Sequence, residues 1–471
     1  MTSALGLDLY QLTSLVVHHA NGRTDTPVTL TFFSRKMPED ESTGEPARAW
    51  LLWCGLERCL DYLAHARIDS NDLDRLCHHP YLGPALDRHA DLVERLRAWK
   101  FSGETLAPRE GTPLFCGPAT RQDGTPFEVD GIRPAAYTPY LVVDCDLLTA
   151  KLIETPLLSI LNHMTMVATK ASVITQAAGS RPVIEFGTRR THPAAAVDAA
   201  VAAYIGGCVA TSNVEAWLRH GVPLQGTHDH FAIQAWEREG VPRHETERAF
   251  FEAFHRTFTE ADTMLVDTYD TFGEKTGIHA AVAATNGDGP YGIRIDSSLS
   301  RDSLWRARRL LDGLGAIDTK IAVSGGVDEN LIAELGDAPI DSFGVGERLV
   351  TSADAPVGVG AVAKLTVIGG RPTTKLSRGS GKAHLPGHIQ VWRDGATDVV
   401  GLAGEEVAGE PLLHPVWTRD GRLPGPALAD VRAHAQRCLE ALPESQRQPR
   451  RMSVAITDAL AALFEGLVRA G

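Results

Sequence analysis

The fold is decided by residues 320–352, which read KIAVSGGVDENLIAELGDAPIDSFGVGERLVTS. Two short apolar runs, Lys320–Val323 and residues 340–343, are each followed by a loop that contains glycines. A helical pattern over residues 328–335 lies between the two runs. A strand, a helix and a second strand in succession are typical of a parallel β-α unit.

The same alternation begins at Val183 and fills the middle of the chain. Strands are expected at Val183–Phe186, Met264–Val266 and Ile293–Ile295, and helices at residues 193–205, 244–259 and 302–313. Successive units of this kind predict an α/β fold built on an incomplete (β/α) barrel, whose functional residues lie where the strands end.

The flanking segments have a different character. Residues 102–140 are rich in Gly, Pro and Thr, which predicts a smaller, β-rich α/β lobe built from N-terminal and C-terminal segments. We therefore expect three parts. They are an N-terminal lobe (residues 1–140), the barrel domain (141–365) and a C-terminal segment (366–471) that partly joins the lobe.

Charge and cysteine content exclude several classes of protein. The chain of 471 residues has 46 basic and 59 acidic side chains, a net charge of −13, which disfavours a nucleic-acid or membrane partner. Seven irregularly spaced cysteines predict neither a disulfide framework nor a zinc knuckle, and they favour the cytoplasm. We recognise no signal peptide and no run of about 18 apolar residues, so we expect no membrane span.

Polar side chains follow the expected strands. Phe186 and Arg189 could bind a flat anionic ring by stacking and by a bidentate ion pair. The alternative is a core aromatic beside solvated arginines. Ser212 lies in GCVATSN, which by itself is typical of a helix cap.

The string GTHDH (residues 226–230) offers two histidines. The spacing of His228 and His230 can ligate a metal, but no third Cys or His is evident nearby in the sequence. A neutral structural histidine is one alternative. A nucleophilic histidine that accepts a phosphoryl group, oriented by Asp229, is another.

Charged and glycine-rich strand ends complete the candidates. Asp267, Asp270 and Asp296, with Arg294, could hold Mg²⁺ or ribose hydroxyls, although Asp also collects in surface turns. The last two strands lead into loops whose backbone N–H groups suit a phosphate, with plain tight turns as the alternative. The loop residues are Ser324, Gly325, Gly326, Gly344 and Gly346.

Several strings together resemble the nicotinate phosphoribosyltransferase family, and they follow the family's order over most of residues 6–393. The strings are DLYQLT, KLIETPLLSILN, EFGTRR, AYIGGCVATSN, GTHDH, LVDTYDT, RIDS, IAVSGGVDE and DSFGVGERLVTS. The resemblance implies a homodimer with a type II phosphoribosyltransferase fold. It implies transfer of phosphoribosyl from 5-phosphoribosyl-1-pyrophosphate (PRPP) to nicotinate, with Mg²⁺ and with ATP hydrolysis, giving nicotinate mononucleotide and pyrophosphate for NAD salvage.

The resemblance also implies roles for single residues. Tyr10 would reach into the partner's site and sandwich the pyridine ring with Phe186. Arg189 would lie near the ring's substituent, and His230 would be phosphorylated from ATP. The remaining matches concern the ribose, the pyrophosphate and the phosphate-binding turns; they are Asp267, Arg294, Asp296, the Ser324–Gly326 loop and the Gly344–Gly346 loop.

The chemistry of such a reaction suits these residues. The pyridine nitrogen has a free lone pair, so no general base is needed, and the ring becomes cationic in the product. Two flanking aromatic rings favour that cation by roughly 1 kcal/mol or more. The related nicotinamide enzymes carry Asp where this chain has Ser212, and a serine can donate to the acid, so we expect nicotinate rather than the amide.

Several positions depart from the family pattern. The family commonly reads D-S-G-D where this chain has Ser298 and Leu299, and it commonly has Thr at Glu347. His388-Ile389 replaces a basic pair, and Ala210 replaces a Gly. Two alternatives therefore stay open: a divergent paralogue that acts on another heteroaromatic acid in specialised metabolism, and a non-catalytic ligand-binding regulator.

Overall fold

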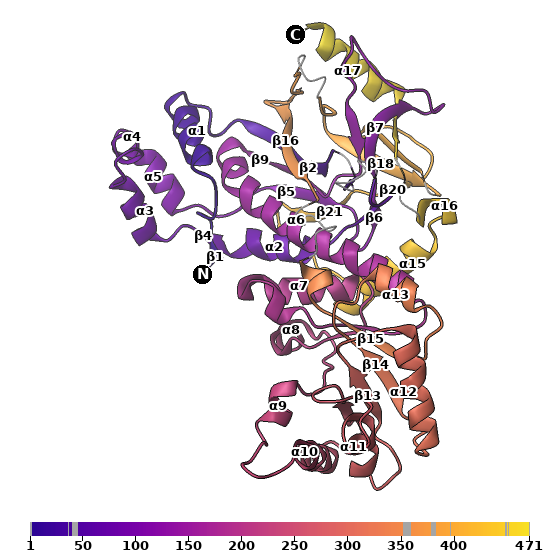
Figure 1. Cartoon of the computed structure of the whole chain (residues 1–471). Helices are drawn as coiled ribbons and strands as arrows, with labels where there is room; N and C mark the ends of the chain where they lie inside the picture. The colour runs from indigo at the N-terminus through magenta and orange to yellow at the C-terminus, as the bar shows by residue number, and fades with distance from the viewer. Residues whose placement is uncertain are drawn as a thin grey trace. The chain divides into compact units, whose positions relative to one another are not determined.

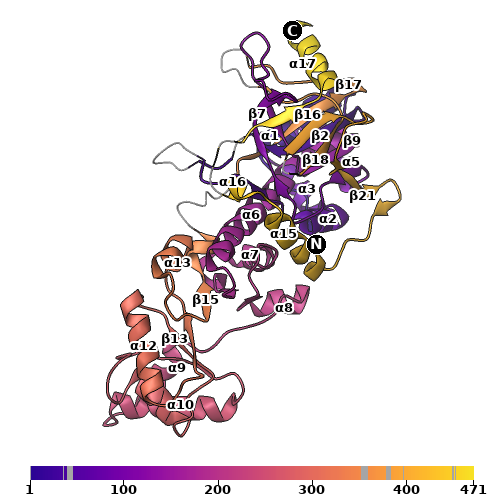
Figure 2. The same cartoon turned by 90° about the vertical axis from the view of Figure 1, so that its right-hand side faces the viewer.

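The computed structural model describes residues 2–35, 37–39, 46–351, 359–377, 383–395, 397–447, 450 and 452–470. By its internal contacts the chain divides into two compact units (Figures 1 and 2). The barrel unit is Lys170–Ser352, and the lobe unit combines Met1–Thr169 with Ala353–Gly471. The lobe unit thus takes the larger share of the chain, whereas the sequence suggested a smaller lobe. The domain limits at residues 140 and 365 stay predictions.

A six-stranded parallel sheet forms the barrel unit, as the alternation of strands and helices predicted. Its strand order is β11-β10-β15-β14-β13-β12, and its strands bury Ile, Val, Leu and Phe side chains. The α/β fold with a half-barrel is therefore confirmed. The strands are β10 (Val183–Glu185), β11 (Ala210–Thr211), β12 (Thr263–Leu265), β13 (Gly292–Ile295), β14 (Lys320–Val323) and β15 (Ser342–Val345).

Helices follow these strands, and several begin with a side-chain cap. Asn213 caps α8 by accepting from Ala216 N at 2.9 Å, and Asp328 caps α13 by accepting from Leu331 N at 2.9 Å. Such caps satisfy amide groups that the first helical turn leaves free. The helices are η1 (Thr188–Arg190), α7 (Pro193–Ile205), α8 (Val214–His220), α9 (His230–Gln234), α10 (Arg243–Thr257), α11 (Gly277–Ala284), α12 (Arg301–Gly313), α13 (Glu329–Leu335) and α14 (Glu347–Val350).

One strand prediction needs correction, and one strand was not expected. Residues 340–343 were expected to form the last strand, but β15 begins at Ser342, because Ile340 ends the preceding turn by donating to Ala338 O. Gly344 therefore lies inside a strand and not in a loop. The two-residue strand β11, Ala210–Thr211, was not expected, since a run so short has no periodicity to detect.

The lobe unit interleaves early and late parts of the chain in two sheets. One sheet has the order β17-β16-β2-β9-β5-β21-β22 and the other β20-β18-β19-β23-β7-β8. The strands of the first are β2 (Pro27–Ser34), β5 (Glu104–Ala107), β9 (Leu141–Asp146), β16 (Ala361–Ile368), β17 (Arg371–Pro372), β21 (His414–Thr418) and β22 (Gly421–Arg422). Those of the second are β7 (Cys116–Arg121), β8 (Ala135–Tyr137), β18 (Ile389–Asp394), β19 (Thr397–Leu402), β20 (Glu410–Pro411) and β23 (Val454–Ile456).

Helices and two short strand pairs complete the lobe unit. The pairs are β1 (Thr2–Ser3) with β4 (Ala66–Arg67) and β3 (Leu51–Leu52) with β6 (Pro113–Leu114). The helices are α1 (Leu9–Ala20), α2 (Leu56–His65), α3 (Ser70–Cys77), α4 (Gly83–Asp87), α5 (Ala90–Arg97), α15 (Leu428–Glu440), α16 (Glu444–Arg447) and α17 (Asp458–Ala470).

One helix in the described part of the chain, α6 (Leu147–Ala178), is long and apolar enough to cross a membrane by length and composition. Scattered polar residues interrupt its apolar run, so the sequence did not mark it as a candidate span. In the structure 67% of its most apolar window is buried, which is the usual state of the core helix of a soluble protein.

Candidate functional site

The candidate residues of the barrel unit gather where the six parallel strands end. Parallel strands bring their carboxyl ends to one edge of the sheet, so residues far apart in the sequence become neighbours. Every strand contributes at least one residue. These are Phe186 after β10, Ser212 after β11, Asp267 after β12, Asp296 after β13, Ser324 after β14 and Gly346 after β15.

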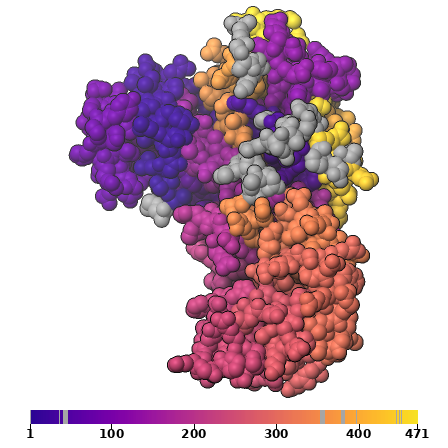
Figure 3. All heavy atoms as spheres, viewed as in Figure 1, coloured from indigo at the N-terminus to yellow at the C-terminus, as the bar shows by residue number. Residues whose placement is uncertain are grey.

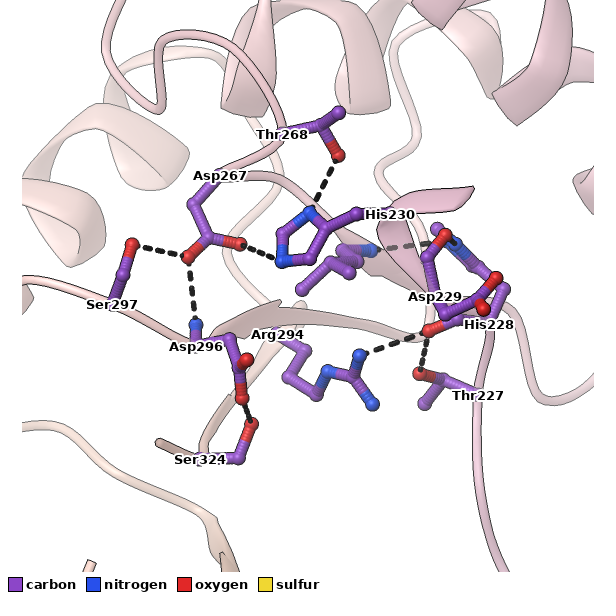
Figure 4. Close-up of polar contacts among 11 residues, drawn as sticks. Thr227, His228, Asp229, His230, Asp267, Thr268, Arg294, Asp296, Ser297 and Ser324 are labelled. Carbon is purple, nitrogen blue, oxygen red and sulfur yellow. Dashed lines mark hydrogen bonds and ion pairs between the residues drawn. The ribbon is translucent and has the colours of Figure 1, made fainter. Parts of the chain in front are cut away.

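Asp267 is the centre of this edge (Figure 4). Its Oδ2 accepts hydrogen bonds from Asp296 N at 2.9 Å and from Ser297 Oγ at 2.7 Å. Its side chain is only 3% exposed, and its Oδ1 is buried without a hydrogen-bond partner among the described residues. The Asp296 carboxylate in turn accepts from Ser324 Oγ. Three successive strand ends are thus connected by one chain of hydrogen bonds.

His230 lies beside this chain at the start of α9. Its Nδ1 is 3.0 Å from Thr268 Oγ1, and its Nε2 is 3.9 Å from Asp267 Oδ1. The side chain is 40% exposed, so a reactant can reach it. Asp229 accepts from Ala232 N at 3.0 Å and so caps α9, which fixes the orientation of this turn.

His228 has the opposite character. Its Nε2 accepts from Leu265 N at 3.1 Å, and its ring lies 4.8 Å from the rings of Phe250 and Phe254. Burial lowers the pKa of His228 to about 4, so the imidazole is neutral at physiological pH. Because Nε2 already accepts from the backbone, this geometry favours the alternative of a neutral structural histidine for His228 over that of a metal ligand.

Arg294 brings a buried cation to the same edge. It donates to His228 O at 2.9 Å, and its guanidinium lies 5.9 Å from the centroid of the Phe186 ring. Burial lowers the pKa of Arg294, although a guanidinium stays charged. Its Nε has no hydrogen-bond partner in the described part of the chain. A buried donor of this kind is suited to a bound anion.

Two features around Phe186 differ from what the sequence predicted: Glu185 was not predicted at all, and Gly344 was predicted to bind phosphate rather than to contact the ring. Glu185 is buried and accepts from Gly187 N and, at 2.5 Å, from Thr211 Oγ1; burial raises the pKa of this carboxyl. The backbone of Gly344 lies directly beneath the ring, since a Cβ at this position would lie 2.3 Å from a ring carbon. An acid at the end of an apolar strand was the available signal for Glu185.

The glycines after β14 take left-handed backbone conformations. Gly325 has φ +88° and Gly326 φ +69°, and a Cβ on Gly325 would lie 1.8 Å from Asp296 O. Only glycine fits so close to the neighbouring strand end. Gly346 precedes the short helix α14, whose first residue, Glu347, forms an exposed ion pair with Arg190 at 3.5 Å.

The remaining predicted residues make no side-chain hydrogen bond within this chain of contacts in the described part of the protein. Arg189 is exposed on η1, and Ser212 is partly buried, with its N–H donating to Glu185 O at 2.9 Å. Tyr10 belongs to α1 of the lobe unit, where it is 54% exposed, and its role at the ring stays a prediction.

Such an arrangement defines an α/β enzyme class that binds anionic substrates at the carboxyl edge of a parallel sheet. No family model matches the chain. The nicotinate phosphoribosyltransferase pncB1 of Mycobacterium tuberculosis is 37% identical over 370 residues, which cover 79% of this chain and 74% of that protein. The pncB2 protein of the same organism is 34% identical over 456 residues, covering 94% of this chain and 88% of its own length.

The fold agrees with that relationship. The crystal structure of human nicotinic acid phosphoribosyltransferase matches with a TM-score of 0.78 and 24% identity, over 98% of this chain and 99% of the human chain. The chain therefore belongs to the nicotinate phosphoribosyltransferase family.

Proposed function

We propose that the protein transfers the phosphoribosyl group of PRPP to the pyridine nitrogen of nicotinate in NAD salvage, with release of pyrophosphate. ATP hydrolysis is coupled to the transfer through phosphorylation of His230. The observation that carries this proposal is the position of His230, an accessible imidazole between Thr268 and the buried carboxylate of Asp267. A phosphohistidine there would be formed beside the groups proposed to hold the sugar and the leaving group.

The ring subsite is proposed to lie against Phe186. Arg294 already lies 5.9 Å from the centroid of the Phe186 ring, so a cation is tolerated at that ring. The pyridinium of the product is favoured by the same attraction. Arg189 and the Ser212 hydroxyl would hold the carboxylate of nicotinate. An amide in the same place would lose the ion pair, a difference of about 1–3 kcal/mol.

The sugar subsite is proposed to lie along the Asp267–Asp296–Ser324 chain of hydrogen bonds. Carboxylates there stabilise the positive charge that develops at C1 of the ribose as pyrophosphate departs. Arg294 offers the leaving group a preorganised positive charge. The amides of Gly325, Gly326 and Gly346 would hold the phosphate on the ribose, whereas the Ser324 N–H already donates to Ile295 O at 3.0 Å.

Mg²⁺ fits this donor set. The buried Oδ1 of Asp267 has no hydrogen-bond partner among the described residues, and Asp296 lies next to it; one or two carboxylates together with substrate phosphates are a usual Mg²⁺ site. When bound, Mg²⁺ would supply charge neutralisation for the pyrophosphate.

The assembly is proposed to be a cytoplasmic homodimer. Leu9, Tyr10 and Val17 on α1 are exposed apolar or aromatic side chains, which suits a surface that a second copy covers. Tyr10 would then complete the ring subsite of the partner subunit.

Phosphoribosyl transfer is tested with purified protein, nicotinate, PRPP, Mg²⁺ and ATP, with mass spectrometry to detect the new nucleotide. We expect nicotinate mononucleotide, little use of nicotinamide, and loss of most ATP stimulation in His230→Ala. The matched control is His244→Ala, a histidine on α10 outside the chain of contacts around Asp267. ATP stimulation that persists in His230→Ala would contradict the phosphohistidine, and equal turnover of acid and amide would contradict the role of Ser212.

A second candidate is a paralogue with another heteroaromatic acid as its substrate. It is favoured by the Ser298-Leu299 departure, which lies directly after the Asp296-Ser297 turn and lacks the second carboxylate. A panel of pyridine and pyrimidine acids in the same assay separates the two, since a paralogue would turn over one of them faster than nicotinate. Binding of nicotinate without any turnover would favour the regulator instead.

A further inference from the structure

A cluster of two histidines and one aspartate lies in the lobe unit, where the end of α1 meets the start of α5. His19 is in the last turn of α1, His89 precedes α5, and Asp91 is in the first turn of α5. Their possible ligand atoms all lie within 4.8 Å of one another. Among the described residues, these three side chains form the one group of His, Cys, Asp or Glu whose spacing could hold a metal ion.

The packing around the cluster is firm enough to hold three ligands in place. Leucines from α1, α3, α4 and α5 line a small apolar cavity, so these helices share one hydrophobic core. Figure 3 shows the same N-terminal helices as adjoining indigo and purple surfaces. The leucine side chains include Leu12, Leu15, Leu73, Leu86, Leu92 and Leu96. Ligands on well-packed elements keep their geometry when no ion is bound.

His19 is the buried member of the cluster. Its Nε2 is 3.0 Å from Asp91 Oδ2, while its side chain is only 9% exposed. Its Nδ1 is buried and has no hydrogen-bond partner in the described part of the chain. Because Nε2 faces Asp91, it is this nitrogen that would ligate an ion shared with Asp91. The ring of His89 lies across it at 5.5 Å, nearly perpendicular.

We propose that His19, His89 and Asp91 form a binding site for a divalent transition metal ion of the Zn²⁺ type. Two imidazoles and one carboxylate suit such an ion, whereas Mg²⁺ and Ca²⁺ prefer oxygen ligands throughout. The Asp91 side chain is 76% exposed, so the fourth position faces water. Closed structural zinc sites have four protein ligands. This open site therefore binds an exchangeable ion.

The bound ion joins α1 to α5. A hydrogen bond connects His19 to Asp91, and the rings of His19 and His89 are in edge contact; the metal would add a coordinate bond from His89. Since α1 also carries Tyr10, the ion stiffens the helix that presents this side chain. The site does not depend on phosphoribosyl transfer, because its three residues belong to the lobe unit alone.

The experiment titrates the full-length, chelator-treated protein with Zn²⁺ by calorimetry. His89→Ala and Asp91→Asn are suitable variants, because the structure gives His89 no side-chain cap bond to α5 and Asn has the shape of Asp. The matched controls are His78→Ala and Asp72→Asn, a histidine that ends neighbouring α3 and an aspartate in its first turn.

We expect wild type and both controls to bind one equivalent of Zn²⁺ per chain. Their melting temperatures should rise as the Zn²⁺ concentration is increased. Both site variants should bind this equivalent at least about 100-fold more weakly, since even loss of a second-shell partner costs roughly 10–100-fold. Circular dichroism of the metal-free proteins checks that each variant is folded. Equal Zn²⁺ affinity in His89→Ala and His78→Ala, no bound equivalent in wild type, or displacement of Zn²⁺ by equimolar Mg²⁺ would each overturn the proposal.

Discussion

Glu247, on α10, is a buried acid close enough to Asp267 and Asp270 for their charges to act on it. Its Oε2 accepts from Gly277 N at 2.8 Å, and its Oε1 is buried without a hydrogen-bond partner among the described residues. Burial, assisted by the two aspartates, raises the pKa of Glu247 to about 7. The folded protein therefore holds a proton here that the unfolded chain releases at lower pH.

We expect Glu247→Gln to change the pH dependence of stability. A carboxyl whose pKa is raised by folding lowers the free energy of unfolding as pH rises from about 4.5 to 7, on the order of 3 kcal/mol in total. The glutamine side chain does not titrate, so its variant should not lose this stability. The free energy of unfolding of Glu247→Gln should therefore rise relative to that of wild type between pH 5 and pH 8. Urea denaturation at both pH values measures this. The control is Glu245→Gln, an exposed acid on the same helix, and a constant difference between variant and wild type would contradict the expectation.

The backbone of Ser298 is strained. It has φ +54°, a left-handed conformation that favours glycine, and the resemblance noted in the sequence led us to expect glycine there. We expect Ser298→Gly to stabilise the protein by about 0.5–1 kcal/mol. Ser180→Gly is the control, since Ser180 is an exposed turn residue without a positive φ and should lose stability instead. If Ser298→Gly also lowered the free energy of unfolding, the serine side chain would contribute more stability than its left-handed backbone conformation costs.

At the scale of the element, β15 supports the residue that follows β10. Phe186 N donates to Val345 O at 2.8 Å, and the ring lies on Gly344. We expect Gly344→Ala to cost about 1–3 kcal/mol, as inserted atoms in a packed core do, and to weaken nicotinate binding as the ring moves. Gly313→Ala is the control, because a Cβ there meets nothing within 4 Å. Thermal unfolding and nicotinate titration measure the two effects; unchanged values in Gly344→Ala would mean that the ring does not depend on this contact.

The elements also show what the sequence could reveal. Strands β10, β12, β13 and β14 were predictable because each is an apolar run between turn signals. The lobe sheets were not, because β16 pairs with β2 across more than three hundred residues, and nothing local marks such a partner. At the site, several charged residues at strand ends stood out from their neighbours, but Glu185 was missed although it ends an apolar strand, and Glu247 lies inside a helix where nothing local marks it. Their importance comes from burial, which a single sequence does not record.

At the scale of the whole molecule, the C-terminal segment is joined to the N-terminal half by a histidine. His388 Nε2 lies 2.8 Å from Asp144 Oδ2, and Thr29 Oγ1 donates to the other oxygen at 2.5 Å. The hydrogen bond to Asp144 raises the pKa of His388. Burial alone would raise the pKa of Asp144, but the hydrogen bonds from His388 and Thr29 outweigh it and lower that pKa. Pairing with Asp144 thus favours the protonated, positively charged form of His388.

The pH dependence of this pair follows from the two shifts. The contribution of His388 is complete below its ordinary pKa near 6.5 and is lost as pH rises through the raised value, while that of Asp144 is lost only in acid. Both side chains are about one-third exposed, so the pair is worth at most about 1 kcal/mol. We expect His388→Gln to destabilise the protein most near pH 5.5 and less at pH 8.5, measured by urea denaturation. His414→Gln, an exposed histidine on β21, should show no such difference, and an equal loss at both pH values in His388→Gln would mean that packing, and not charge, joins the two segments.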